Sequence, residues 1–141
     1  MSQKRSRIGM GLIILAIITG LLFWSELLFS SVPSLLDVPS RASTLGWSVN
    51  NARLYFTGLA ILDLLGGLGI VLFLIRFIGK DKGARTTAVF QATLIVTVVY
   101  AIYQFGIAFA LPNELRPVYW IIGIVYVLIA LGLRTLYRRS N

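Results

Sequence analysis

The sequence predicts an all-α membrane protein in which four transmembrane helices form an up-down bundle with both termini in the cytoplasm. Hydrophobic residues make up 57% of the chain and charged residues 13%, whereas about 25% of an average soluble domain is charged. Four long apolar runs fill nearly all of the 141 residues. The breaks between the runs are short and alternate between basic and nearly neutral, which indicates alternating sides of a membrane.

The apolar runs cover residues 8–29, 54–75, 88–111 and 118–136, and together they form one transmembrane domain. A helix needs about 20 residues to cross about 30 Å of hydrocarbon, and each run approaches or exceeds this length. Because lipid offers the backbone no hydrogen bonds, each run should satisfy its amides internally, as a helix does.

Basic residues decide the predicted orientation, because ten of the thirteen fall on one side of the bundle. They are Lys4, Arg5, Arg7, Arg76, Lys80, Lys82, Arg85, Arg134, Arg138 and Arg139. The positive-inside bias therefore predicts cytoplasmic termini and a cytoplasmic (inner) cell membrane. The net charge of +8 is explained by topology and by attraction to anionic lipids, so we expect the lipid bilayer, and not nucleic acid, as the partner.

The first span follows a basic stretch, but its apolar run exceeds the 7–15 residues of a signal peptide, so we expect it to be retained. At 1.5 Å per residue, Glu26 lies about 27 Å from the start of this span, near the outer interface. Arg53 and Arg116 precede or begin spans at the same level. We therefore predict an outer ion pair between Glu26 and Arg53 or Arg116.

The segment 30–53 joins the first two spans on the outside. Pro33 and Pro39 bracket a short apolar stretch, and Trp47 follows among Ser and Asn residues. Two structures fit this pattern, a connecting loop with an aromatic anchor and a short interfacial helix or turn on the outer surface. We favour the connecting loop.

In the second span, Asp63 is the one ionisable residue near a span centre, roughly 16 Å deep. A carboxylate there costs about 2.5–3.5 kcal/mol, so it should face the bundle interior. It either binds protons or a ligand, or it fixes helix packing, and the sequence favours neither. Gly66 and Gly67 lie about one turn away on the same face and predict a close helix contact.

The third span carries a polar stripe, because Thr93, Thr97, Tyr100 and Gln104 follow one another at spacings of four, three and four. Tyr100 should lie at the depth of Asp63. We therefore predict an intramembrane polar site of Asp63, Thr97, Tyr100 and Gln104, in which Asp63 contacts Tyr100 or Gln104. The alternative is a stripe of ordinary interhelical hydrogen bonds worth about 0.6 kcal/mol each.

The fourth span has Tyr119, Gly123, Tyr126 and Ala130 on one face. Small and aromatic residues alternate there, so we expect Gly123 to pack against a neighbouring helix. With the second and third spans, this face could enclose a narrow aromatic-lined cavity.

The chain contains no Cys and no His. It therefore lacks thiol chemistry and the commonest general base and metal ligand, and we expect no metal site and no cofactor. An enzyme is the least favoured class, although a mechanism that uses carboxylates or tyrosines stays open.

Residues 58–69, GLAILDLLGGLG, resemble the DoxX-like family of small four-span membrane proteins, in which an acidic residue shortly precedes a Gly-Gly pair. The resemblance covers this part of the second span, together with the overall size and the number of spans. It implies a role similar to accessory subunits of membrane redox complexes, including quinone-linked ones. It assigns matching positions to Asp63, Gly66 and Gly67.

We expect a non-catalytic accessory or scaffolding component that binds another membrane protein or a second copy of the chain. The alternative is a small transporter or lipophile-binding protein that uses Asp63. A cavity that reaches Asp63 would favour transport, and a sealed bundle with an apolar outer groove would favour a subunit. Two converging carboxyl groups would favour an enzyme, but we expect Glu26 and Asp63 to lie too far apart in depth.

Overall fold

The computed structural model describes residues 2–81 and 83–140, and within them every regular element is a helix. The elements are α1 (Ser2–Glu26), the π-helical segment η1 (Leu27–Ser31), α2 (Val32–Leu36), α3 (Val38–Leu45), α4 (Val49–Ile78), α5 (Ala84–Ala108) and α6 (Arg116–Ser140). Four helical segments are long and apolar enough to span a membrane. The prediction of an all-α protein with four such helices is confirmed.

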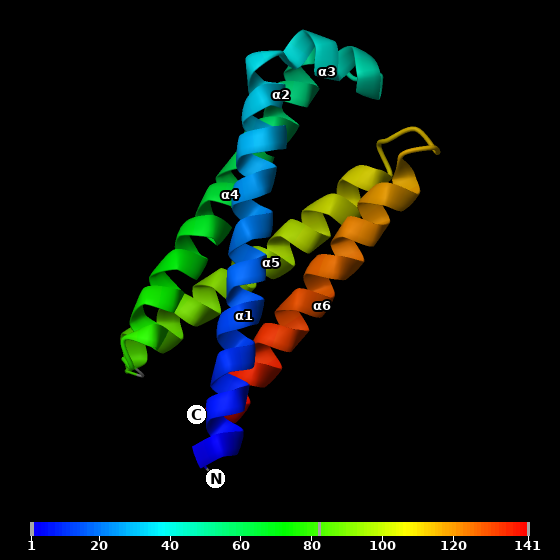
Figure 1. The fold of residues 1–141 in the computed structure, drawn as a ribbon. Coiled ribbons are helices and arrows are strands. Elements are labelled where there is room, and N and C mark those ends of the chain that lie inside the picture. The colour runs from blue at the N-terminus through cyan, green and yellow to red at the C-terminus, as the bar shows by residue number, and fades with distance from the viewer. Residues whose placement is uncertain (1, 82, 141) are drawn as a thin grey trace.

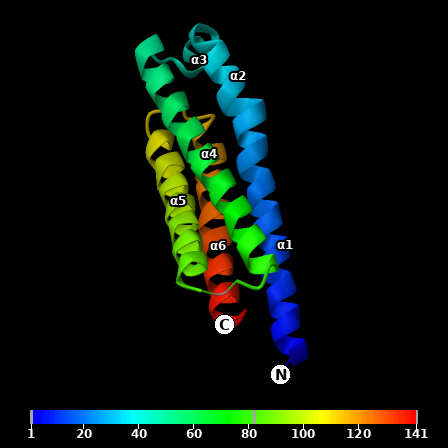
Figure 2. The ribbon, with the colours of Figure 1, turned by 90° about the vertical axis from the view of Figure 1, so that its left-hand side faces the viewer.

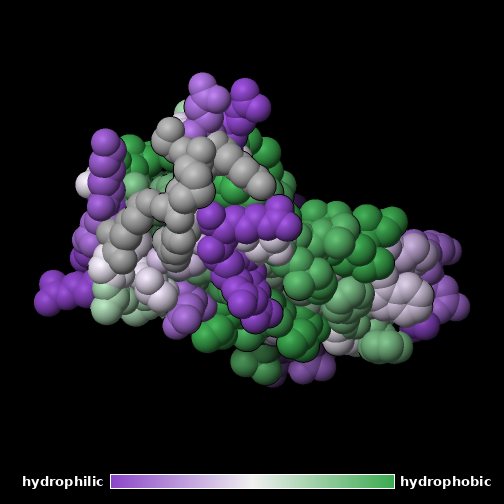
Figure 3. Space-filling view, turned by 90° about the horizontal axis from the view of Figure 1, so that it is seen from below, coloured by the Kyte–Doolittle hydropathy of each residue, from purple (hydrophilic) through white to green (hydrophobic). Residues whose placement is uncertain are grey.

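Helix α1 packs against α4 and α6, and α5 packs against the same two helices, so the four long helices close into a bundle. Figures 1 and 2 show that α1 begins and α6 ends at the same end of the molecule, while α2 and α3 lie at the opposite end. We call these the terminal end and the cap end. Figure 3 looks onto the terminal end, where hydrophilic residues gather beside the hydrophobic flank of the bundle.

The first long helix continues past its predicted end at residue 29. Helix α1 passes through η1 into α2, and the candidate span covers Ser6–Leu36. At the join, the Val32 N–H donates to the carbonyl oxygen of Leu27, five residues earlier, which is the hydrogen-bond pattern of a π-helix. Glu26 therefore lies ten residues before the end of this helix, about 15 Å from it, and not at that end as we expected.

The segment 30–53, which we expected to be a connecting loop, is mostly helical, so that prediction was wrong and short helices form there. Pro33 and Pro39 occupy first-turn positions of α2 and α3, where the missing N–H has no helical partner to lose. Gly46, with φ of 73°, ends α3 in the left-handed conformation. Trp47 then donates from Nε1 to the Ala110 carbonyl at 2.9 Å, which ties the cap end to the end of α5.

Glycines permit the closest contacts between the long helices. A Cβ atom on Gly66 would lie 2.6 Å from the Phe23 ring, and one on Gly67 would lie 2.8 Å from the Trp24 ring. On α6, a Cβ on Gly123 would lie 2.9 Å from the Phe105 ring. These contacts place the middle of α4 beside residues 23–24 of α1.

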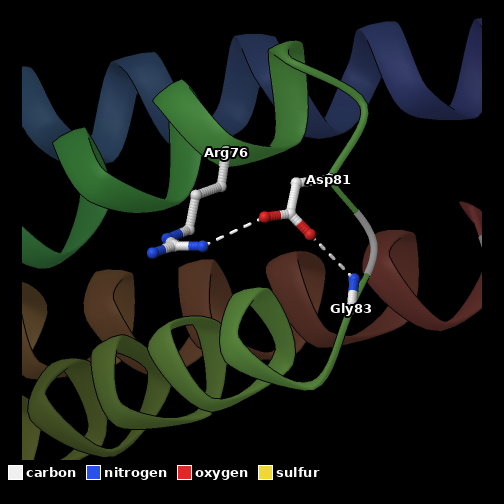
Figure 4. A network of polar contacts seen from close by, with 3 residues as sticks. All are labelled: Arg76, Asp81 and Gly83. Atoms are coloured by element: carbon white, nitrogen blue, oxygen red, sulfur yellow. Dashed lines mark hydrogen bonds and ion pairs between the residues drawn. The ribbon is translucent and has the colours of Figure 1, made fainter.

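At the terminal end, a short polar network holds the turn between α4 and α5 (Figure 4). Asp81 accepts a 3.0 Å hydrogen bond from the Gly83 backbone N–H and forms a 3.0 Å ion pair with Arg76. The Gly83 N–H, with the Arg76 guanidinium as a further contribution, holds the pKa of Asp81 below its ordinary value. The network favours the ionised form of an exposed loop carboxyl group.

Candidate polar site inside the bundle

Asp63 lies on α4 and is fully buried. Its Oδ2 atom accepts a 2.7 Å hydrogen bond from the Ser31 hydroxyl of η1, while Oδ1 has no hydrogen-bond partner. Asp63 therefore makes no hydrogen bond to Tyr100 or Gln104, the two residues that we expected it to contact. The reason is the continued first helix, which carries Ser31 to Asp63 from a segment that we expected to be a loop.

Gln104 instead accepts from the Tyr55 hydroxyl at 3.1 Å, and the Tyr103 hydroxyl donates to the Tyr55 carbonyl at 2.8 Å. These two hydrogen bonds join α5 to α4 near the cap end. The threonines of the stripe form hydrogen bonds within their own helix. The Thr97 hydroxyl, for example, donates to the Thr93 carbonyl at 2.8 Å. Thr97 is buried but makes no hydrogen bond to a neighbouring helix.

Tyr100 stands at the centre of an aromatic cluster. Its ring lies 5.6 Å from the ring of Phe23 and 4.3 Å from the ring of Tyr126, and Phe23 and Tyr126 are 5.4 Å apart. The Tyr100 side chain is fully buried, and its hydroxyl has no hydrogen-bond partner. A buried, unpaired hydroxyl costs free energy, so Tyr100 carries unused capacity to form a hydrogen bond.

Glu26 lies on α1 beside this cluster and is half-buried. Its carboxyl group lies within electrostatic range of Asp63, Tyr100 and Tyr126. The Tyr100 hydroxyl approaches the carboxyl group without reaching hydrogen-bond geometry. Residues 23–24 of the first helix pack against Gly66 and Gly67, so Glu26 lies closer in depth to Asp63 than its position in the sequence suggested.

The predicted outer ion pair does not form. Arg116 donates to carbonyls that end α5, at 2.9 Å to Ala108, 3.4 Å to Phe109 and 3.2 Å to Leu111, where a helix leaves carbonyls without partners. Arg53 is exposed. Among the residues that the structure describes, Arg76 and Asp81 form the one ion pair, so Glu26 has no counter-charge from within that part of the chain.

A groove of about 390 Å³ opens on the flank of the bundle between the first helix and α6. Its lining consists of Leu22, Ser25, Glu26, Phe29, Ser30, Ile121, Ile122, Val125 and Tyr126. We call it the α1/α6 groove. Large apolar side chains are exposed at its rim, among them Phe29 and Ile121, as on a surface that faces lipid. Asp63 does not line the groove.

A second groove of about 450 Å³ lies near the cap end between α4 and α5. Trp47, Tyr55 and Tyr103 supply its aromatic wall. The hydroxyl groups of the two tyrosines are engaged in hydrogen bonds to Gln104 and to the backbone. This groove is lined by no acidic or basic side chain.

Comparison with protein-family models, curated proteins and solved structures found no match. The resemblance to the DoxX-like family therefore stays a prediction. Within residues 2–81 and 83–140, no three acidic side chains gather in a way that could hold a metal ion. The chemistry of the site is that of two carboxyl groups and a set of tyrosines in apolar surroundings.

Sequence reasoning placed Asp63, Tyr100 and Gln104 in the interior but missed two members of the site. Ser31 was assigned to a loop, and Glu26 was assigned to the interface. Both errors arose because we did not expect the first helix to continue across Pro33. Proline is compatible with a helix at a first-turn position.

Proposed function

We propose that this protein is a multi-pass protein of the cytoplasmic membrane that binds a membrane amphiphile in the α1/α6 groove. One observation carries the proposal: the Glu26 carboxyl group lines a groove on the membrane-facing flank and also neighbours buried Asp63 and Tyr100. The split of basic residues supports cytoplasmic termini. The groove then lies in the outer half of the membrane.

The groove has the composition that an amphiphile needs. Its walls are mostly aliphatic and aromatic, and the polar groups of Ser25, Glu26 and Ser30 occur along one side, on the first helix. Its volume of about 390 Å³ falls in the range of about 300–1,000 Å³ that is typical of small-molecule sites. An apolar body can lie along α6 while a polar head reaches Glu26.

Burial of Asp63 argues against a path through the bundle. The side chain is fully buried and lines neither groove. We therefore assign the accessible polar role to Glu26, and we assign Asp63 the role of holding η1 through Ser31. This proposal keeps the lipophile-binding alternative from the sequence analysis. Its polar centre is Glu26 in place of Asp63.

Native mass spectrometry of the full chain in mild detergent tests this proposal. The wild type should retain about one amphiphile per chain, and Val125→Trp, which fills the groove, should lose it. Ile124→Trp is the matched control, because Ile124 is exposed on α6 but lines neither groove. A wild type without a retained amphiphile, or equal retention by Val125→Trp, would contradict the proposal.

The second candidate is a non-catalytic accessory or scaffolding component, as the resemblance to the DoxX-like family implies. Asp63 is sealed inside the bundle and the grooves lie outside it, which is the arrangement that we expected of a subunit. Affinity purification in mild detergent should then recover a membrane partner in a fixed ratio. Recovery of the chain alone would leave the amphiphile proposal as the better one.

A further inference from the structure

Glu26 is an acidic side chain in a membrane-facing groove without a counter-charge among the described residues. The two arginines expected to neutralise it are engaged elsewhere or exposed, since Arg116 bonds three carbonyls and Arg53 is exposed. A carboxyl group in apolar surroundings is costly unless a partner of opposite charge or a hydrogen-bond donor satisfies it.

A second observation concerns the interior directly behind Glu26. The Tyr100 hydroxyl is fully buried, has no hydrogen-bond partner, and approaches the Glu26 carboxyl group. Tyr100 itself does not line the groove, so Glu26 is the acidic group that a ligand in the groove can reach. Most buried polar groups in folded proteins have partners.

Aromatic and aliphatic walls complete the arrangement. Tyr126 lines the groove, and its ring lies 4.3 Å from the ring of Tyr100, tilted by 46°. Phe29 lies at the exposed rim of the groove. Aromatic faces attract organic cations, and the attraction grows where water is excluded. A carboxyl group beside aromatic rings with apolar walls matches a cation that carries hydrophobic substituents.

We infer that the ligand of the α1/α6 groove is a lipophilic organic cation, whose positive centre lies against Glu26 and whose apolar groups lie along α6. This inference rests on the proposed function and names the chemical class of its ligand. A neutral amphiphile of the same shape would fill the walls but leave Glu26 without a counter-charge.

The test compares two probes of similar shape and different charge, methyltriphenylphosphonium and triphenylphosphine oxide, by equilibrium dialysis against the full chain in mild detergent. The wild type should bind the cation about tenfold more tightly than the neutral oxide. Glu26→Gln should remove this preference, and Glu26→Asp should keep most of it. Glu114→Gln, which removes an exposed acid from the loop before α6, should leave it unchanged.

Each outcome decides one of the two proposals. If both probes bind equally and Val125→Trp abolishes both, the groove binds amphiphiles and the inference about charge is wrong. If Glu26→Gln keeps the preference for the cation while retaining the melting temperature of the wild type, the inference is also wrong. If neither probe binds the wild type, the inference is overturned, while retention of an amphiphile in native mass spectrometry would still support the proposed function.

Discussion

Among individual residues, Ser31 and Asp63 form a buried hydrogen bond between the π-helical segment and the middle of α4. Asp63→Asn keeps an acceptor oxygen for Ser31 and should change stability little. Asp63→Leu leaves the Ser31 hydroxyl buried without its partner and should cost about 1–3 kcal/mol. Denaturant titration in detergent measures both variants.

A double variant sharpens this test. Ser31→Ala with Asp63→Leu removes both polar partners, so it should recover part of the loss seen in Asp63→Leu alone. If the double variant shows the simple sum of the two single losses, the hydrogen bond does not contribute to stability.

Asp81 predicts a pH dependence at the terminal end. The Gly83 N–H, and then Arg76, lower the pKa of Asp81 in the folded protein. Its stabilising contribution is therefore complete above the ordinary pKa of 3.8, and it is lost as the pH falls through the lower folded value. The melting temperature in detergent should drop between about pH 6 and about pH 3, and the drop should be smaller for Asp81→Asn than for the wild type. Equal losses in the two proteins would refute this role, and Glu114→Gln serves as the control.

The residues of the site were only partly predictable from the sequence. Burial of Asp63 and the shared level of Tyr100 followed from span positions and helical spacing, because these depend on local periodicity. The hydrogen bond to Ser31 did not, because it depends on one π-helical turn that changes the direction of the following side chains. Partner choice inside a bundle depends on small helix rotations that spacing does not encode.

Among elements, the glycines of α4 set its distance from α1. Gly66→Leu and Gly67→Leu would meet the rings of Phe23 and Trp24, so together they should destabilise the bundle by at least about 1–3 kcal/mol, the usual range for added bulk. Gly106→Leu is the control, since no atom lies within 4 Å of a Cβ built there. A melting temperature in detergent equal to that of the wild type for the double variant would show that this face does not pack.

The four long helices were predictable because long apolar runs leave few alternatives in lipid. The end of the first helix was not, since Ser30, Ser31 and Pro33 lower its apolar character without breaking it. This one boundary changed the interpretation of Glu26. Counting from the start of the helix placed Glu26 at the interface, whereas in the structure it lies near Asp63.

For the whole molecule, the even number of spans and the basic terminal end predict one orientation. Reporter fusions after Asn141 and within residues 81–83 should be cytoplasmic, and a fusion near Thr44 should be external. An external C-terminus would contradict the topology and would place the α1/α6 groove in the other half of the membrane.

We propose that Glu26, and not Asp63, is the carboxyl group that a molecule in the membrane can reach. Dicyclohexylcarbodiimide, which partitions into lipid and modifies carboxyl groups in apolar surroundings, tests it directly in membranes that contain the full chain. Peptide mass spectrometry should find the modification on Glu26, slower modification in Val125→Trp, and none on Asp63. Modification of Asp63 at the rate of Glu26, or an unmodified Glu26, would show that Glu26 is not the accessible carboxyl group.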